Sequence, residues 1–190
     1  MNIQNINWFA LVGGVLTLLV IPVSYISPWW RLSIGQNLID VNASPVHSVF
    51  TFLNTQFTAP LLWALNLSVI LFLLVAGIVM LTYSVLATKP YARDLLDFAY
   101  KKPLYLIVFF LAGILIVIAI LTSFLQLDIP IIGPANITLP SNFTGEAQIS
   151  VAVNAGFGLA FWLAIAASIM CIIARIYHTR ITQQSVPITT

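Results

Sequence analysis

The sequence predicts an all-α integral membrane protein, a four-transmembrane-helix bundle with a small extracellular β element formed by its two outer loops. Composition is the first observation behind this class: 61% of the 190 residues are hydrophobic and 6% are charged, whereas ordinary soluble domains have about 25% charged residues. The second is a set of four apolar runs, at residues 8–26, 61–86, 104–125 and 153–176. A helix of about 20 apolar residues crosses the hydrocarbon core of a bilayer, so each run predicts one span.

The third observation is an uneven distribution of charge between the connections. The connection 87–103 and the C-terminal tail together hold six basic and two acidic residues, a net charge of +4, and the connections 27–59 and 126–150 hold one basic and three acidic residues, a net charge of −2. Basic residues concentrate on the cytoplasmic side of membrane proteins. We therefore expect a multi-pass plasma-membrane protein of one domain, with both termini and residues 87–103 in the cytoplasm and the other two loops outside.

The first span and the first outer loop differ in pattern. No Lys or Arg precedes residues 8–26 and no Ala-x-Ala cleavage pattern follows them, so we expect a retained helix and not a signal peptide. Residues 30–34 alternate between apolar and polar, and a Gly-Gln pair separates them from a second short apolar run, which predicts a β-hairpin. Ser44 and Pro45, followed by apolar residues at helical spacing, predict a short amphipathic helix that ends near Leu53.

Two tryptophans, Trp29 and Trp30, follow the first span directly. Tryptophan is enriched where helices leave the bilayer, which explains the pair as part of an interfacial belt. The pair is also compatible with a wedge that fixes the hairpin to the helix ends, and the two interpretations do not exclude each other. Both interpretations place the tryptophans at the outer membrane surface.

The second outer loop and the sequons agree with an outside location. Three prolines divide this loop into strand-like pieces, which predict strands that extend the same sheet. Asn42, Asn136 and Asn142 each begin an Asn-x-Ser/Thr sequon in a predicted outer loop, so they are glycosylation candidates and the chain is a candidate glycoprotein. Asn66 also begins a sequon, but it lies in a predicted span, where its amide, like that of Asn154, is expected to bond across helices.

The cytoplasmic connection predicts a short helix along the inner membrane surface. Pro90 suits its first turn, and Arg93 and Asp97 have the spacing of an i,i+4 ion pair. Lys101 and Lys102 follow, and we expect them to meet anionic lipid headgroups. Membrane lipids are therefore expected partners.

The fourth span contains small residues at strict intervals of four: Ala152, Gly156, Ala160, Ala164 and Ser168. Small side chains at this spacing let another helix approach closely. The neighbour is either a helix of the same bundle or another subunit, and for the second case Gly156, Ala160 and Ala164 are candidate interface residues. The other spans have glycines at 13, 14, 77 and 113, where the missing side chain leaves room for a neighbouring helix.

Residues suited to catalysis, metal binding or proton transfer are scarce. The spans contain no Asp, Glu, Lys, Arg or His before Arg175, which argues against a proton-coupled transporter, a voltage sensor and a haem-binding bundle. Cys171 is the only cysteine, which excludes an internal disulfide and a multi-cysteine metal site, and it is expected to pack in the core. His47 and His178 are expected to be solvated. We therefore expect no enzyme activity, no cofactor, no metal and no nucleic-acid partner.

The predicted arrangement resembles that of the claudin and peripheral-myelin-protein family: four helices, cytoplasmic termini, a tryptophan-bearing hairpin in a larger first outer loop, and a smaller second loop. In that family the first loop carries a Trp and a Gly-Leu-Trp element followed by two disulfide-bonded cysteines, whereas here only Trp29 and Trp30 correspond and the cysteines are absent. The resemblance implies a surface or cell-adhesion protein that associates with itself or with other membrane proteins through its outer loops. Trp29, Trp30 and Arg31 are then the candidate contact residues.

Two other functions remain open at this point. The chain is alternatively an accessory structural subunit of a larger membrane complex, such as a respiratory, secretion or pilus assembly, held through its fourth helix. A small-solute transporter is the least favoured alternative, because charged residues are missing from the spans.

Overall fold

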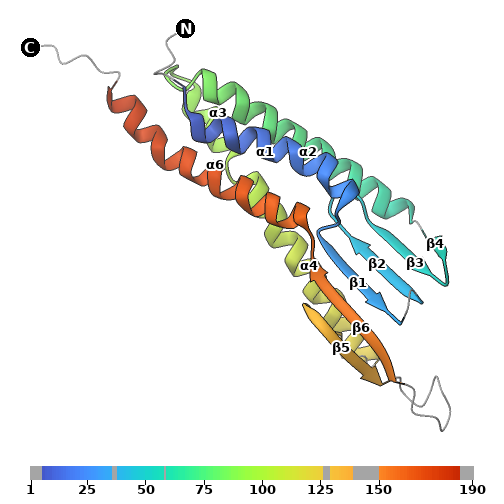
Figure 1. Ribbon diagram of the computed structural model, residues 1–190. Helices are drawn as coiled ribbons and strands as arrows, with labels where there is room; N and C mark the ends of the chain where they lie inside the picture. Colours follow the sequence, from blue (N-terminus) through green and yellow to red (C-terminus); the bar gives the residue numbers. More distant parts are fainter. Residues whose placement is uncertain (1–5, 36–37, 58, 126–128, 139–149, 185–190) are drawn as a thin grey trace, which may run out of the picture. The chain divides into compact units, whose positions relative to one another are not determined.

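The computed structural model describes residues 6–35, 38–57, 59–125, 129–138 and 150–184. Within these ranges the elements are the helices α1 (Trp8–Ile26), α2 (Pro60–Val85), α3 (Ala92–Ala99), α4 (Lys102–Leu125) and α6 (Leu159–Gln184), and the strands β1 (Trp30–Ile34), β2 (Ile39–Ala43), β3 (Val49–Phe52), β4 (Thr55–Phe57), β5 (Gly133–Thr138) and β6 (Ser150–Phe157) (Figure 1). The chain divides into two compact units. Met1–Val23, Ser68–Ile107 and Trp162–Thr190 form the first, called the helical unit here, and Ser24–Leu67 and Val108–Phe161 form the second, the sheet unit.

Four helical segments in the described chain are long and apolar enough to cross a membrane: Trp8–Ile26, Pro60–Val85, Ala92–Ser123 and Leu159–Thr179. By length and composition the chain is therefore a multi-pass membrane protein. The expected β element is present but larger than expected, because it is a six-stranded sheet. Its last strand takes up residues 150–157, so the fourth helix begins at Leu159 and not at residue 153.

Glycines allow the helices of the helical unit to approach closely. A Cβ atom added to Gly14 of α1 would lie 3.1 Å from the carbonyl oxygen of Gly77 of α2, and one added to Gly77 would lie 2.6 Å from a side chain of α1. Gly13 faces α6, where a Cβ would lie 2.9 Å from the sulfur of Cys171. The close helix approach predicted at these three glycines and the packing role of Cys171 are thus confirmed. At Gly113 nothing lies within 4 Å of an added Cβ, so no close neighbour is found there.

A buried polar network joins α1, α2 and α6 within the helical unit. The side-chain amide of Asn7 donates to the Tyr83 hydroxyl oxygen (3.0 Å) and to the carbonyl oxygen of Ala174 (3.1 Å), and the Tyr83 hydroxyl lies 2.9 Å from Nδ1 of His178. The histidine tautomer sets which of these two groups donates in the last bond. His178 is only 6% exposed, so the expectation of a solvated histidine is wrong: its ring is buried and bonds to Tyr83 of α2.

The helix predicted in the connection is confirmed as α3. Its buried side packs in the core of the helical unit together with residues of α1, α2 and α6. The predicted ion pair forms, with Nε of Arg93 3.6 Å from a carboxylate oxygen of Asp97. Beyond α3, the ammonium group of Lys102 lies 3.9 Å from the ring centroid of Phe98, so this lysine contacts an aromatic ring of its own chain.

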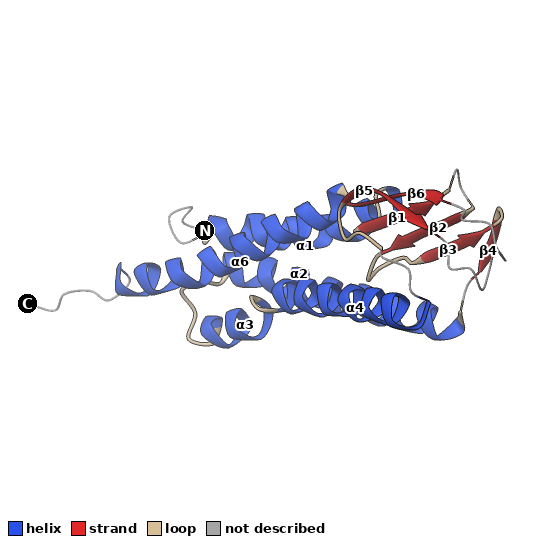
Figure 2. Cartoon of the chain, turned by 90° about the horizontal axis from the view of Figure 1, so that it is seen from below, coloured by secondary structure: helices blue, strands red, loops and turns tan. Residues whose placement is uncertain are grey.

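All six strands form one antiparallel sheet in the order β4-β3-β2-β1-β6-β5 (Figure 2). The predicted hairpin is confirmed as β1–β2, in which Trp30 lies opposite Ala43 and Ile34 opposite Ile39. The second loop adds β5 and β6, as predicted, and β6 pairs with β1. Residues far apart in the sequence therefore meet at the centre of the sheet.

The chain after Ser44 forms a second hairpin, where the sequence predicts a helix. Ser44 Oγ accepts a hydrogen bond from the backbone N–H of Val46 at 3.3 Å, a local turn in place of a helix cap. Leu53 and Asn54 have φ angles of 47° and 62°, and positive φ at both central residues gives the two-residue turn that matches the twist of paired strands. The expected helix is wrong because this turn folds the chain back and pairs β3 with β4.

Side chains alternate along each strand, so the sheet has one apolar and one polar face. On β1, Trp30, Leu32 and Ile34 are buried on the apolar face, as the alternation predicted. They form a core with residues of β5, β6 and α4, in which Phe110 and Ile114 represent the helix. Within the sheet unit, α4 therefore packs on the apolar face over β1, β6 and β5 (Figure 1).

Candidate functional site

Trp29 fixes the sheet to the helices of its own unit. Its side chain is fully buried, and its indole N–H donates to Ser24 Oγ at 2.9 Å. Its ring meets Phe110 of α4 and Phe161 of α6 edge to face, with centroid distances of 5.1 Å and 5.9 Å. The backbone N–H of Gly158 donates to the Trp29 carbonyl oxygen at 3.0 Å, which joins the start of β1 to the end of β6.

Trp30 completes this attachment from the next position. Its indole N–H donates to the carbonyl oxygen of Ile131 at 2.9 Å, and only 4% of the residue is exposed. The wedge interpretation of the two tryptophans is thus confirmed. Their role as contact residues for a partner stays a prediction, and because both rings are buried, a partner at this surface meets the neighbouring Arg31 first.

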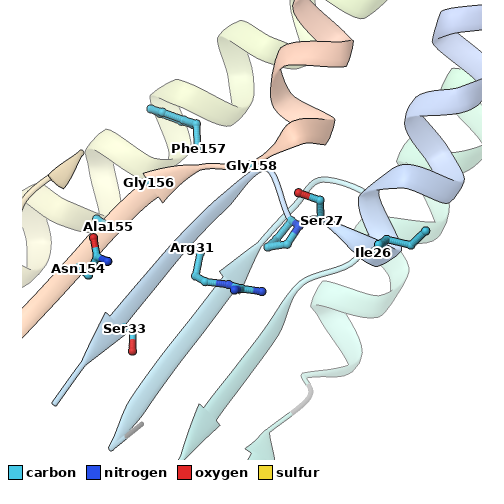
Figure 3. Close-up of a pocket in the computed structure, with 10 residues that line it drawn as sticks. Ile26, Ser27, Arg31, Ser33, Asn154, Ala155, Gly156, Phe157 and Gly158 are labelled. Atoms are coloured by element: carbon cyan, nitrogen blue, oxygen red, sulfur yellow. The ribbon is translucent and has the colours of Figure 1, made fainter. Parts of the chain in front are cut away.

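A hollow of about 400 Å³ lies on the polar face beside Arg31 (Figure 3). The Arg31 Nε–H donates to the amide oxygen of Asn42 on β2 at 2.9 Å, and Figure 3 shows the side chain reaching over that neighbouring strand. Gly156 lies opposite Arg31 on β6 and has no side chain to fill the hollow, since nothing lies within 4 Å of an added Cβ there. The ten lining residues include one cation and several neutral hydrogen-bonding groups but no carboxylate and no histidine. This set suits contact with another molecule better than acid–base chemistry.

Five polar residues and one proline also form a row across the six strands. In register from β5 to β4 the row consists of Pro134, Asn154, Ser33, Asp40, Thr51 and Gln56. The expectation that Asn154 bonds between helices is wrong, because this residue lies on β6. The row gives the polar face a mixed, mostly neutral surface with one carboxylate.

The apolar face carries an exposed patch at β3 and β4, called the hairpin patch below. It consists of Phe50, Phe52, Leu53 and Phe57, which are 39%, 42%, 59% and 51% exposed. The rings of Phe50 and Phe57 lie 6.1 Å apart on the paired strands. Strand β4 is a sheet edge with neither charge nor proline, whereas β5, the other edge, contains Pro134, which has no N–H to offer a further strand.

The ridge of small residues in the predicted fourth span lies partly on a strand. Ala152 and Gly156 belong to β6, and in a strand residues four apart share a face because the period is two, so the expected helical ridge is wrong there. Ala160, Ala164 and Ser168 lie on α6 and are at most 3% exposed. This burial agrees with a neighbour inside the same chain, and the contact of these residues with another subunit stays a prediction.

The sequon asparagines have different surroundings. Asn42 is half-buried beside Arg31, Asn136 is exposed on β5, and Asn142 lies outside the described residues. The amide of Asn66 donates to the carbonyl oxygen of Pro45 at 3.1 Å and accepts from the backbone N–H of Ser48 at 3.2 Å. It therefore holds the loop before β3, and the expectation that Asn66 bonds across helices is wrong.

Comparison with known proteins does not assign the chain to a family. No family model matches the sequence, and no curated protein matches it. The resemblance to the claudin arrangement stays an expectation that rests on the order of elements and on the tryptophans of the first outer loop. In the described part of the chain, no three His, Cys, Asp or Glu side chains are grouped as ligands for a metal ion.

Proposed function

We propose that this chain is a plasma-membrane surface protein that associates with copies of itself through its sheet, in the manner of a claudin-like contact protein and without catalysis. The observation that carries the proposal is the hairpin patch, a group of exposed aromatic and aliphatic side chains beside an open sheet edge. Contiguous apolar surface of this kind marks interaction sites in folded proteins. The charge difference between the connections supports an outside location for the sheet, and the exposed sequon at Asn136 is then available for glycosylation.

The size of the patch defines the kind of association. From the exposed fractions and about 150–250 Å² for a whole aromatic side chain, the patch offers roughly 350 Å² of apolar surface per copy. Two copies would bury roughly 700 Å², below the roughly 1,200 Å² of stable soluble complexes. Each contact is therefore weak, and confinement of both copies to a bilayer supplies the high effective concentration that makes it productive.

The test compares the stoichiometry of the full chain in lipid bilayers for two kinds of variant. Phe52→Ser and Phe57→Ser remove apolar surface from the hairpin patch. Ile132→Ser is the matched control, because Ile132 is 67% exposed and lies outside the patch. Single-molecule photobleaching of labelled protein should show oligomers for the parent and the control and mainly monomers for the two patch variants. Unchanged oligomers in both patch variants would mean that the patch does not carry the association.

An accessory role in a larger complex is the second candidate, and α4 supplies its observation. Phe109, Ile116 and Ile120 share one side of α4, away from the residues that meet the sheet, and are 73%, 60% and 50% exposed. A helix of another membrane protein fits such a side as well as lipid does. Purification in mild detergent with mass spectrometry of the co-eluting proteins separates the candidates, since a fixed set of foreign subunits supports this role and homo-oligomers support self-association.

A further inference from the structure

A second hollow, of about 440 Å³, lies in the helical unit and is lined by basic residues. Lys89 comes from the connection between α2 and α3, Arg93 from the first turn of α3, and Arg175 and His178 from α6. The sequence pointed to Lys101 and Lys102 as the contacts for anionic groups. The fold instead brings together three cations that lie up to 86 positions apart in the sequence.

Positive charge dominates the lining of the hollow. No carboxylate belongs to its lining, and the acid that touches the lining is Asp97, which lies 3.6 Å from Nε of Arg93 and 2.9 Å from Nε of Arg175. Three cations and one carboxylate leave a net charge of +2 when His178 is neutral. A phosphate monoester carries about −1.5 to −2 charges at pH 7, so its charge is complementary to this group.

The geometry shows a formed site and not only a basic surface. The Arg175 side chain is 26% exposed, and Asp97 contacts it through Nε, which fixes the plane of the guanidinium fork that recognises phosphate oxygens. On the same helix, the carbonyl oxygen of Ala174 accepts a hydrogen bond from Asn7, and His178 bonds to the Tyr83 hydroxyl. The part of α6 that carries Arg175 is therefore tied to the buried network on both sides, while Lys89 and Arg93 are exposed at the edge of the hollow.

The position of the hollow limits the source of the ligand. Arg175 and His178 belong to the last turns of the candidate span Leu159–Thr179, and Lys89 follows α2, which ends at Val85. In a membrane, the ends of spans lie at the level of the lipid headgroups. Basic pockets at that level bind phosphorylated headgroups.

We infer that this hollow is a binding site for a phosphate monoester, presented either by a lipid headgroup or by a small soluble organic phosphate. The fork of Arg175 binds two phosphate oxygens, and Lys89 and Arg93 neutralise the remaining charge. The volume falls in the range of about 300–1,000 Å³ found for small-ligand sites. The site does not depend on the proposed self-association, because all its residues lie in the helical unit.

The experiment uses the full chain in nanodiscs of phosphatidylcholine and has two arms. In the lipid arm the discs also contain phosphatidylinositol 4-phosphate or, for comparison, phosphatidylserine, and native mass spectrometry counts bound lipids. In the soluble arm glycerol 3-phosphate is titrated against discs of phosphatidylcholine alone. Binding in the lipid arm with preference over phosphatidylserine assigns a headgroup, and binding in the soluble arm assigns a free phosphate.

Variants separate the site from general charge attraction. Lys89→Gln and Arg93→Gln should each weaken binding by roughly tenfold, the usual effect of losing one hydrogen bond to a charged group. Lys101→Gln is the matched control, since Lys101 is exposed in the same unit but does not line the hollow. The inference is overturned if neither probe binds, or if Lys101→Gln weakens binding as much as the two site variants do.

Discussion

Replacing Gly158 by alanine tests the junction between β6 and α6 in the sheet unit. An added Cβ would overlap the carbonyl group of Pro28 and lie 2.7 Å from Ser27 Oγ. The φ angle of Gly158 is not positive, so alanine meets no backbone strain there and the effect comes from the contact alone. Gly156 provides the matched control, because it lies two residues earlier on the same strand and nothing lies within 4 Å of its added Cβ.

The size of the destabilisation by Gly158→Ala depends on which atoms must move to make room for the added Cβ. Overpacking a tight site costs about 1–3 kcal/mol, and here the obstacle is main chain, so the junction itself must shift. The shift weakens the hydrogen bonds from Gly158 N–H to the Trp29 carbonyl (3.0 Å) and from Leu159 N–H to Ser27 Oγ (2.9 Å). At about 0.5–1.5 kcal/mol for each bond, we expect Gly158→Ala to lower the free energy of unfolding by roughly 2–6 kcal/mol.

The control substitution, Gly156→Ala, should not lower the free energy of unfolding. Gly156→Ala lies in open space and reduces the conformational freedom of the unfolded chain, so it should be neutral or stabilise by about 0.4–1 kcal/mol. Thermal unfolding of both variants in detergent, followed by far-ultraviolet circular dichroism, measures the difference. A Gly158→Ala protein that melts with the parent, or a Gly156→Ala protein that loses as much stability, would refute the steric reasoning.

Three other perturbations test the orientation, the helix crossing and the tryptophan wedge. On intact cells, a membrane-impermeant thiol reagent should label Asn142→Cys but not Thr88→Cys, and the reverse pattern would contradict the proposed orientation. Gly77→Leu should remove most of the folded yield, because its Cβ position already meets α1, whereas Gly113→Leu should be tolerated, and equal yields would argue against the close crossing. Trp29→Phe should lower the free energy of unfolding in a denaturant titration by about 1–3 kcal/mol, because it removes a buried indole hydrogen bond, and an unchanged midpoint would show that this bond is dispensable.

The strands could be predicted from the sequence where apolar and polar residues alternate clearly and where the apolar residues fit the strand repeat but not the helical one. Residues 30–34 alternate strictly, and they form β1 as expected. After Ser44 the apolar residues fit a helical period and a strand period equally well, which is common for short runs. The deciding feature is the positive φ at Leu53 and Asn54. Asparagine adopts this conformation readily, but leucine does not, so the pair lacks the Asn-Gly pattern that marks such a turn.

The same ambiguity explains the error at the fourth span. Small residues four apart share a face in a helix and also in a strand, so Ala152 and Gly156 continued the pattern of α6 without belonging to it. The boundary lies at Gly158, where the chain passes against Pro28, and that contact joins positions 130 residues apart. The basic hollow could not be predicted for a similar reason, because Arg175 comes near Lys89 only in the folded chain.

The pairing of β1 with β6 has a consequence for how this chain is made. Ile34 pairs with Val153, so ribosomes must add roughly 120 residues after β1 before its second neighbour exists, which takes on the order of 6–24 s at about 5–20 residues per second. During that interval the nascent β1 strand presents an unpaired edge, the form most prone to pairing with a foreign strand. Shielding of this edge during translation would therefore protect the nascent chain from aggregation, and a product truncated before β6 would keep the edge of β1 unpaired.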